Sequence, residues 1–300
     1  MKNVALVLAS GGPRGFAYIG AIEELQARGY NITSVAGASA GSLVGGIYAA
    51  GGIKAFKEWI CALEPMKIMS LMDVSVSKTY LVKGEKIIKA IEARVPEVNI
   101  EDLEIPFTAV ATDLYTGEEV VFRKGPLFQA IRASISIPSM FKPVKWKGRT
   151  LVDGGMVNTF PLNRVERTPG DILVGFNVNQ IDAAEIQGFL DSRAALTQGR
   201  DEMSLLSRLQ NDLQAFRLNA DGRDSWIPVG ADDNYASILQ RSFGIMNCTI
   251  ARMGIELTKP DILVDLPFDS YHGVYGYSHA QEICEKGREL MAAALDKYES

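Results

Sequence analysis

Residues 35–41 read Val35-Ala36-Gly37-Ala38-Ser39-Ala40-Gly41, and a helix-like stretch, 42–50, follows them. An apolar strand that runs into Gly-x-Ser-x-Gly and then into a helix predicts a tight turn. Such a turn holds the serine hydroxyl out from the backbone at a helix N-terminus. Gly37 and Gly41 have no Cβ, so the turn can close and the helix can pack against the strand. A chain with 28 glycines can match this short motif by chance, and a capped glycine-rich turn is the alternative. We predict that Ser39 is a nucleophile.

A second glycine-rich turn lies upstream, after residues 4–9, an apolar run typical of a strand that is buried on both faces. The turn, Ser10-Gly11-Gly12-Pro13-Arg14-Gly15, opens an amphipathic helix that Gly29 ends. A dinucleotide site would need glycine at the position of Ser10, and a phosphate-binding Walker loop would need Gly-Lys-Ser/Thr. An oxyanion hole needs only converging N–H donors near a nucleophile. The loop therefore favours an oxyanion hole.

A third stretch, 150–155, ends an apolar strand with Asp153-Gly154-Gly155. Taken alone, Asp-Gly-Gly is usually a turn. The chain has two histidines, His272 and His279, both far downstream. If neither histidine reaches Ser39, another group must act as the base, and a carboxylate at the end of a strand in the same sheet is suited to that role.

Together these three pieces resemble the patatin-like phospholipase family of serine acyl hydrolases. The glycine loop, the serine turn and the Asp-Gly-Gly motif occur in the order and spacing of that family. Further similar stretches are Ala109–Leu114 with Thr116-Gly117, Ala133–Pro138, Phe141–Val144, Asn158 and Pro161. The resemblance covers residues 4–180 well and the rest loosely.

The resemblance implies a lipid-degrading enzyme with a serine–aspartate dyad. Ser39 would attack an ester carbonyl, and Asp153 would take the proton directly and later activate water. Because Pro13 has no N–H, the oxyanion hole would draw on the backbone N–H groups of Gly11, Gly12 and Arg14. A carboxyl with an ordinary pKa near ~4 is a poor base at neutral pH, so we expect burial to raise the pKa of Asp153.

Several alternatives remain open. A conventional α/β-hydrolase would use Ser39, Asp153 and His279 in that order along the chain. In that fold, however, several strands precede the serine turn, whereas only one or two precede it in this chain. A catalytically inactive relative would instead bind lipid or a protein partner. The Arg14 side chain could neutralise a substrate phosphate or, as a surface residue, cap nearby carbonyls.

Composition limits partners and location. A formal net charge of −5 argues against nucleic acid as a partner and against recruitment to anionic lipid by charge alone. The substrate would be a phospholipid or another acyl ester, with at most peripheral contact with a lipid surface. We expect no metal or other cofactor, no signal peptide and no transmembrane segment, and hence a cytoplasmic protein. Cys61, Cys248 and Cys284 are widely spaced and predict buried, reduced thiols.

Alternating strand and helix patterns over 300 residues predict one α/β domain (1–300). Its architecture would be a three-layer α/β/α sandwich around a mostly parallel sheet, with the glycine loops at the carboxyl ends of the strands. The segment 190–257 looks mainly helical. It could be a lid or a face for homodimer formation, but packing against the back of the sheet is the interpretation that we favour slightly.

Overall fold

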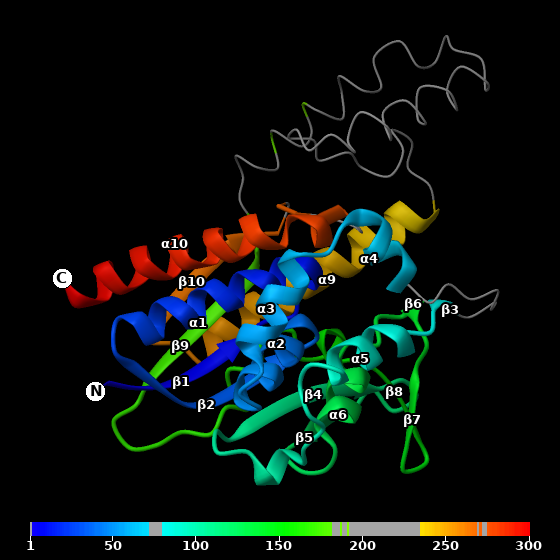
Figure 1. The fold of residues 1–300 in the computed structure, drawn as a ribbon, viewed down its shortest axis with the longest axis horizontal. Coiled ribbons are helices and arrows are strands. Elements are labelled where there is room, and N and C mark those ends of the chain that lie inside the picture. The colour runs from blue at the N-terminus through cyan, green and yellow to red at the C-terminus, as the bar shows by residue number, and fades with distance from the viewer. Residues whose placement is uncertain are drawn as a thin grey trace.

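The computed structural model describes residues 2–71, 80–181, 187, 191, 235–268, 270–271 and 275–300. Most of its strands belong to one sheet with the order β10-β9-β1-β2-β4-β8-β7, and β5 pairs with β4 as well (Figure 1). These strands are β1 (Lys2–Leu8), β2 (Tyr30–Ala38), β4 (Phe107–Asp113), β5 (Glu119–Phe122), β7 (Val144–Trp146), β8 (Arg149–Asp153), β9 (Ile172–Gln180) and β10 (Ile262–Pro267). A separate pair joins β3 (Tyr80–Val82) and β6 (Ser139–Phe141).

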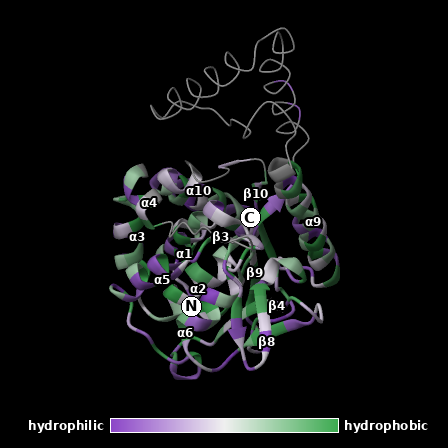
Figure 2. Cartoon of the chain, turned by 90° about the vertical axis from the view of Figure 1, so that its right-hand side faces the viewer, coloured by the Kyte–Doolittle hydropathy of each residue, from purple (hydrophilic) through white to green (hydrophobic). Residues whose placement is uncertain are grey.

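Helices cover both faces of the sheet. The helical elements are η1 (Gly12–Phe16), α1 (Ala17–Ala27), α2 (Ala40–Ala49), α3 (Ile53–Cys61), α4 (Pro65–Leu71), α5 (Glu85–Glu92), η2 (Ile100–Asp102), α6 (Leu127–Ser134), η3 (Gly154–Met156), α9 (Tyr235–Leu257), η4 (Tyr275–His279) and α10 (Ala280–Glu299). Figure 2 shows α9 on one side of the sheet and α1, α2 and α3 on the other. The three-layer α/β/α architecture is therefore as the sequence predicts.

The alternation of β1 explains the two layers of core. Val4, Leu6 and Leu8 join the large cluster beneath α1, α2 and α10, whereas Ala5 and Val7 join a smaller cluster with Ala251 of α9. All five side chains are completely buried, as the continuous apolar run predicts for a strand covered on both faces.

The sheet is parallel only in part. β10, β9, β1, β2 and β4 pair in parallel, as expected for strands joined by helical crossovers. Beyond β4 the pairing becomes antiparallel: short turns connect β4 to β5 and β7 to β8, and β8 itself pairs antiparallel with β4. The short strands β3, β6 and β7 carry too little alternation to be predicted from the sequence.

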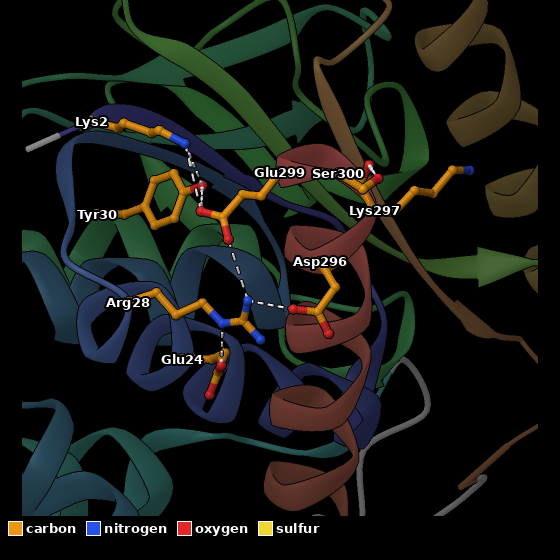
Figure 3. A network of polar contacts seen from close by, with 8 residues as sticks. All are labelled: Lys2, Glu24, Arg28, Tyr30, Asp296, Lys297, Glu299 and Ser300. Carbon is orange, nitrogen blue, oxygen red and sulfur yellow. Dashed lines mark hydrogen bonds and ion pairs between the residues drawn. The ribbon is translucent and has the colours of Figure 1, made fainter.

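Helices α1 and α10 approach each other closely because each has a glycine at the contact. A Cβ on Gly20 would lie 1.8 Å from the carbonyl oxygen of Cys284, and one on Gly287 would lie 1.9 Å from that of Ala17. Polar contacts fasten the other end of this helix pair (Figure 3). There, Arg28 donates to Asp296 at 2.6 Å, and the Tyr30 hydroxyl donates to Glu299 at 2.7 Å. The last helix is thereby held against the first βα unit.

Three further predictions meet the structure here. Of the segment 190–257, α9 packs against β9, while 190 and 192–234 lie outside the described residues, so the lid and the homodimer face stay predictions. Cys248 and Cys284 are buried and Cys61 is half-buried, and none of the three forms a disulfide. Within the described ranges, every helix is too short or too polar to cross a lipid bilayer.

Candidate active site

The turn between β2 and α2 places Ser39 in a backbone conformation that side chains rarely adopt. Its φ is 51° and its ψ is −119°. Gly37 and Gly41, on either side of Ser39, must be glycines because other backbone segments approach them closely. A Cβ on Gly37 would lie 2.3 Å from the carbonyl carbon of Gly41, and one on Gly41 would lie 2.1 Å from the carbonyl oxygen of Leu8. The packing around the turn thus holds a strained residue at the N-terminus of α2.

Asp153 meets Ser39 directly. The Ser39 Oγ donates a hydrogen bond to Asp153 Oδ2 at 2.5 Å. Asp153 is the last residue of β8, and it pairs with Ala111 of the antiparallel neighbour β4. The preceding residue of β4, Val110, pairs with Ala38 at the end of β2. Asp153 is thereby level with the end of β2. A Cβ on Gly154 would lie 2.2 Å from the carbonyl oxygen of Val110. This glycine therefore lets the chain turn tightly against β4 just after the carboxylate.

The carboxylate of Asp153 is buried and accepts few hydrogen bonds. Its side chain is buried, with 5% of the residue exposed. Oδ1 accepts the backbone N–H of Gly155 at 2.7 Å, and Oδ2 accepts the Ser39 hydroxyl. Burial raises the pKa of Asp153 to about 7, although these two hydrogen bonds oppose the shift. Such a group can take up and release a proton near neutral pH.

The glycine loop completes the arrangement. A Cβ on Gly155 would lie 2.7 Å from the Ser10 Oγ, and one on Gly15 would lie 2.5 Å from the Ala40 Cβ, so the loop contacts both other motifs. Gly11 precedes the short helix η1 and Gly12 begins it, with φ +58°. Among the described residues, the backbone N–H groups of Gly11 and Gly12 have no hydrogen-bond acceptor. These two donors are thus available to a ligand.

The Arg14 side chain holds the glycine loop in place through hydrogen bonds to backbone carbonyls. It is buried, so of the two alternatives left open by the sequence the second was wrong about a surface position, although the side chain does cap carbonyls. Its guanidinium donates to the carbonyl oxygens of Gly11 and Phe268 and lies 4.6 Å from the centroid of the Phe268 ring. Tyr18 holds the start of the loop in a similar way, because its hydroxyl donates to the carbonyl oxygen of Ala9 at 2.7 Å. Both side chains therefore fix the position of the loop backbone.

The family model for the patatin-like phospholipase matches residues 6–165, which include all three motifs. The chain belongs to this family. Uncharacterized NTE family proteins of Mycobacterium tuberculosis and Mycobacterium bovis are each 34% identical to it, over 99% of this chain and 92% of the relative. Lysophospholipase nte1 of Emericella nidulans is 26% identical, over 95% of this chain but 18% of that much longer protein. Among solved structures, VipD from Legionella pneumophila matches with a TM-score of 0.45 and 13% identity, over 99% of this chain and 67% of that one.

Of the two histidines, the structure describes His279, whose ring contacts a glutamate. His279 ends η4 and faces Glu282, with 3.2 Å between Nδ1 and Oε2. His272 lies outside the described residues. The Ser39 hydroxyl reaches the Asp153 carboxylate with no ring nitrogen between them.

Two residues beside the Ser39–Asp153 contact were not predicted from the sequence. Ser134, in the family-like stretch 133–138, accepts the backbone N–H of Ser39 on its Oγ at 2.9 Å and is fully buried. Tyr277 packs edge-on against Phe16, with ring centroids 5.8 Å apart. Burial and the nearby Asp153 carboxylate raise the pKa of Tyr277 to about 12. Ser134 lies in one of the family-like stretches and could have been identified from the sequence. Nothing in the sequence around Tyr277 indicates that it lies near Asp153.

Proposed function

We propose that this protein is a serine acyl hydrolase that cleaves carboxylic ester bonds of lipids, of the phospholipase A, lysophospholipase or esterase type. The observation that carries the proposal is the 2.5 Å hydrogen bond from Ser39 Oγ to Asp153 Oδ2. The membership of the patatin-like phospholipase family and the similarity to a protein named lysophospholipase support a lipid ester as substrate.

The first half-reaction forms an acyl-enzyme. Ser39 Oγ attacks the ester carbonyl carbon while its proton passes to Asp153 Oδ2. The carbonyl oxygen becomes an oxyanion, which the N–H groups of Gly11, Gly12 and Arg14 stabilise. As the tetrahedral intermediate collapses, the bond to the leaving alkoxide breaks and the proton on Asp153 moves to that oxygen. The acyl group remains on Ser39.

The second half-reaction releases the acid. A water molecule gives a proton to Asp153 and attacks the acyl-enzyme at the same carbonyl carbon. Collapse of the second intermediate breaks the bond to Ser39 Oγ, which takes its proton back from Asp153. A base with a pKa of about 7 is suited to this double role, because both its protonated and its ionised forms are populated near neutral pH.

The test combines labelling with turnover. The purified chain is treated with a fluorophosphonate probe, and the modified residue is located by mass spectrometry, with Ser39→Ala as the control. Hydrolysis of p-nitrophenyl esters is then measured, followed by fatty acid release from a panel of phospholipids, lysophospholipids and neutral esters. We expect one label on Ser39 and ester turnover that Ser39→Ala abolishes. Absence of both would favour an inactive relative that binds lipid or a partner.

A conventional triad makes a different prediction. Replacing His272 and His279 together by Gln removes every imidazole of the chain. A dyad keeps its ester turnover in this variant, and a triad loses it almost entirely. Because no metal takes part in the proposed steps, turnover should also continue in EDTA, and strict dependence on calcium would contradict the mechanism.

A further inference from the structure

A cavity lies between the sheet and α9, the helix that Figure 2 shows on one side of the sheet. Its volume is about 260 Å³. Residues from β9, β10 and α9 and the residue after β9 line it, and within the described part of the chain these are Asn177, Asn179, Gln180, Ile181, Asp265, Cys248, Thr249, Arg252 and Ile255. Nothing in the proposed hydrolysis uses these residues.

The sheet side of the cavity is polar on a face that is otherwise apolar. Leu173 of β9 belongs to the apolar cluster on this face, and Asn177 and Asn179 follow it on the same side of the strand. Both asparagines are 3% exposed. Asp265 is the register partner of Asn177 on β10. Buried polar groups in such a row need hydrogen-bond partners.

One of the two asparagines, Asn179, leaves a buried acceptor without a donor from the described residues. Asn179 Nδ2 donates to the carbonyl oxygen of Ser10 at 2.7 Å, which fixes the orientation of the amide. Its Oδ1 is buried and receives no hydrogen bond from the residues that the structure describes. Asn177 Oδ1 accepts the backbone N–H of Asn179, and its Nδ2 donates to Asp265 Oδ1 at 2.8 Å. The carboxylate of Asp265 is therefore the acceptor that this wall offers to a ligand with donors, and the unsatisfied Asn179 Oδ1 lies buried beside it.

Opposite charges line the same cavity without neutralising each other. Asp265 is bonded to a neutral amide, and burial raises its pKa. Arg252 reaches the cavity from α9 and forms no ion pair with any carboxylate in the described ranges, Asp265 included. A ligand with a cationic end and an anionic end would match both charges at once.

We propose that this cavity binds a small zwitterion, with its ammonium group at the Asp265 carboxylate and its anionic group at Arg252. A metal ion suits the cavity less well, because the described residues include no group of three His, Cys, Asp or Glu side chains that could ligate one. The volume corresponds to about eight or nine water molecules, which is enough for an amino acid or a phosphorylated amino alcohol.

The test is isothermal titration calorimetry of the full chain carrying Ser39→Ala, which keeps the cavity and removes the proposed nucleophile. The binding result is thereby separate from the fate of the proposed hydrolysis. O-phosphoethanolamine and γ-aminobutyrate are titrated as two zwitterions, one with a lipid head-group's phosphate and one with a free amino acid's carboxylate. Ethanolamine and inorganic phosphate are the single-charge comparisons.

We expect at least one zwitterion to bind about tenfold or more tightly than either single-charge compound. Asp265→Asn, which keeps the hydrogen bond from Asn177, and Arg252→Gln should each weaken that binding by about tenfold or more. Glu256→Gln, an exposed change on α9 outside the cavity lining, should leave it unchanged. Thermal unfolding checks that each variant is folded, and Arg252 is exposed enough to replace without disturbing the core.

Two results would overturn the proposal. One is no measurable binding of either zwitterion at about 10 mM, which would mean that the cavity holds water only. The other is zwitterion binding that persists in both Asp265→Asn and Arg252→Gln, which would place the ligand elsewhere.

Discussion

Replacing Asp153 by Asn should abolish activity and yet stabilise the fold at alkaline pH. The amide has the shape of the carboxylate and can keep both contacts, because Oδ1 can accept the Gly155 N–H and Nδ2 can donate to Ser39 Oγ. It cannot take up a proton, so ester turnover should fall nearly as far as in Ser39→Ala. Retention of more than about a tenth of the activity would contradict the base role.

The stability change follows from the pKa of the buried carboxyl, which rises from 3.8 to about 7 on folding. The folded state then prefers the protonated form, so this group favours folding most below pH 3.8 and its contribution is lost as the pH rises towards 7. For the wild type relative to a neutral side chain, the loss is about 2 kcal/mol at pH 5 and about 4 kcal/mol at pH 8. Asp153→Asn should be the more stable protein, by a margin that grows with pH.

Urea unfolding of both proteins at pH 5 and pH 8 measures this margin. Asp171→Asn is a control of opposite sign: although burial opposes it, the Thr168 N–H and the Arg167 guanidinium lower the pKa of Asp171. A paired carboxylate of this kind supports folding above its unfolded pKa, so its loss should destabilise the protein at pH 8. If Asp153→Asn were less stable than the wild type at pH 8, or if the stability difference did not change with pH, a pKa of Asp153 raised by burial would be refuted.

Three further predictions concern the same site. The value of kcat/KM for ester hydrolysis should rise about tenfold from pH 6 to pH 8 with a midpoint near 7, as Asp153 ionises; a flat profile would contradict this. Gly41→Ala should lower the free energy of unfolding by about 3 kcal/mol or more, because its Cβ meets a β1 carbonyl at 2.1 Å. Gly254→Ala within α9, whose Cβ would lie 3.4 Å from the carbonyl oxygen of Phe160, should be neutral or stabilising, and equal effects of the two substitutions would disprove the steric argument. Ser134→Ala leaves the buried backbone N–H of Ser39 without its acceptor and should cost about 1–3 kcal/mol in urea unfolding; an unchanged midpoint would show that water replaces the hydroxyl.

Much of the parallel half of this fold could be predicted locally. The apolar run 4–9, the serine turn at 35–41 and the helix stop at Gly29 are encoded within a few residues, since strand burial, close packing at glycine and a positive φ (+76° at Gly29) depend on side chains next to one another. The family motifs also placed Ser39 and Asp153 as candidates for one site.

The local sequence by itself determined where a strand is followed by a turn and a helix, and where the turns have glycine. Only the tertiary structure decided how these segments meet. The antiparallel pairing of β8 with β4 sets Asp153 level with Ser39. Arg14 turns inward to the carbonyl of its own loop and to that of the distant Phe268, and Tyr277 comes from η4. The pKa of Asp153 was likewise decided by burial, because desolvation is a property of everything packed around a carboxyl and is not carried by its neighbours along the chain.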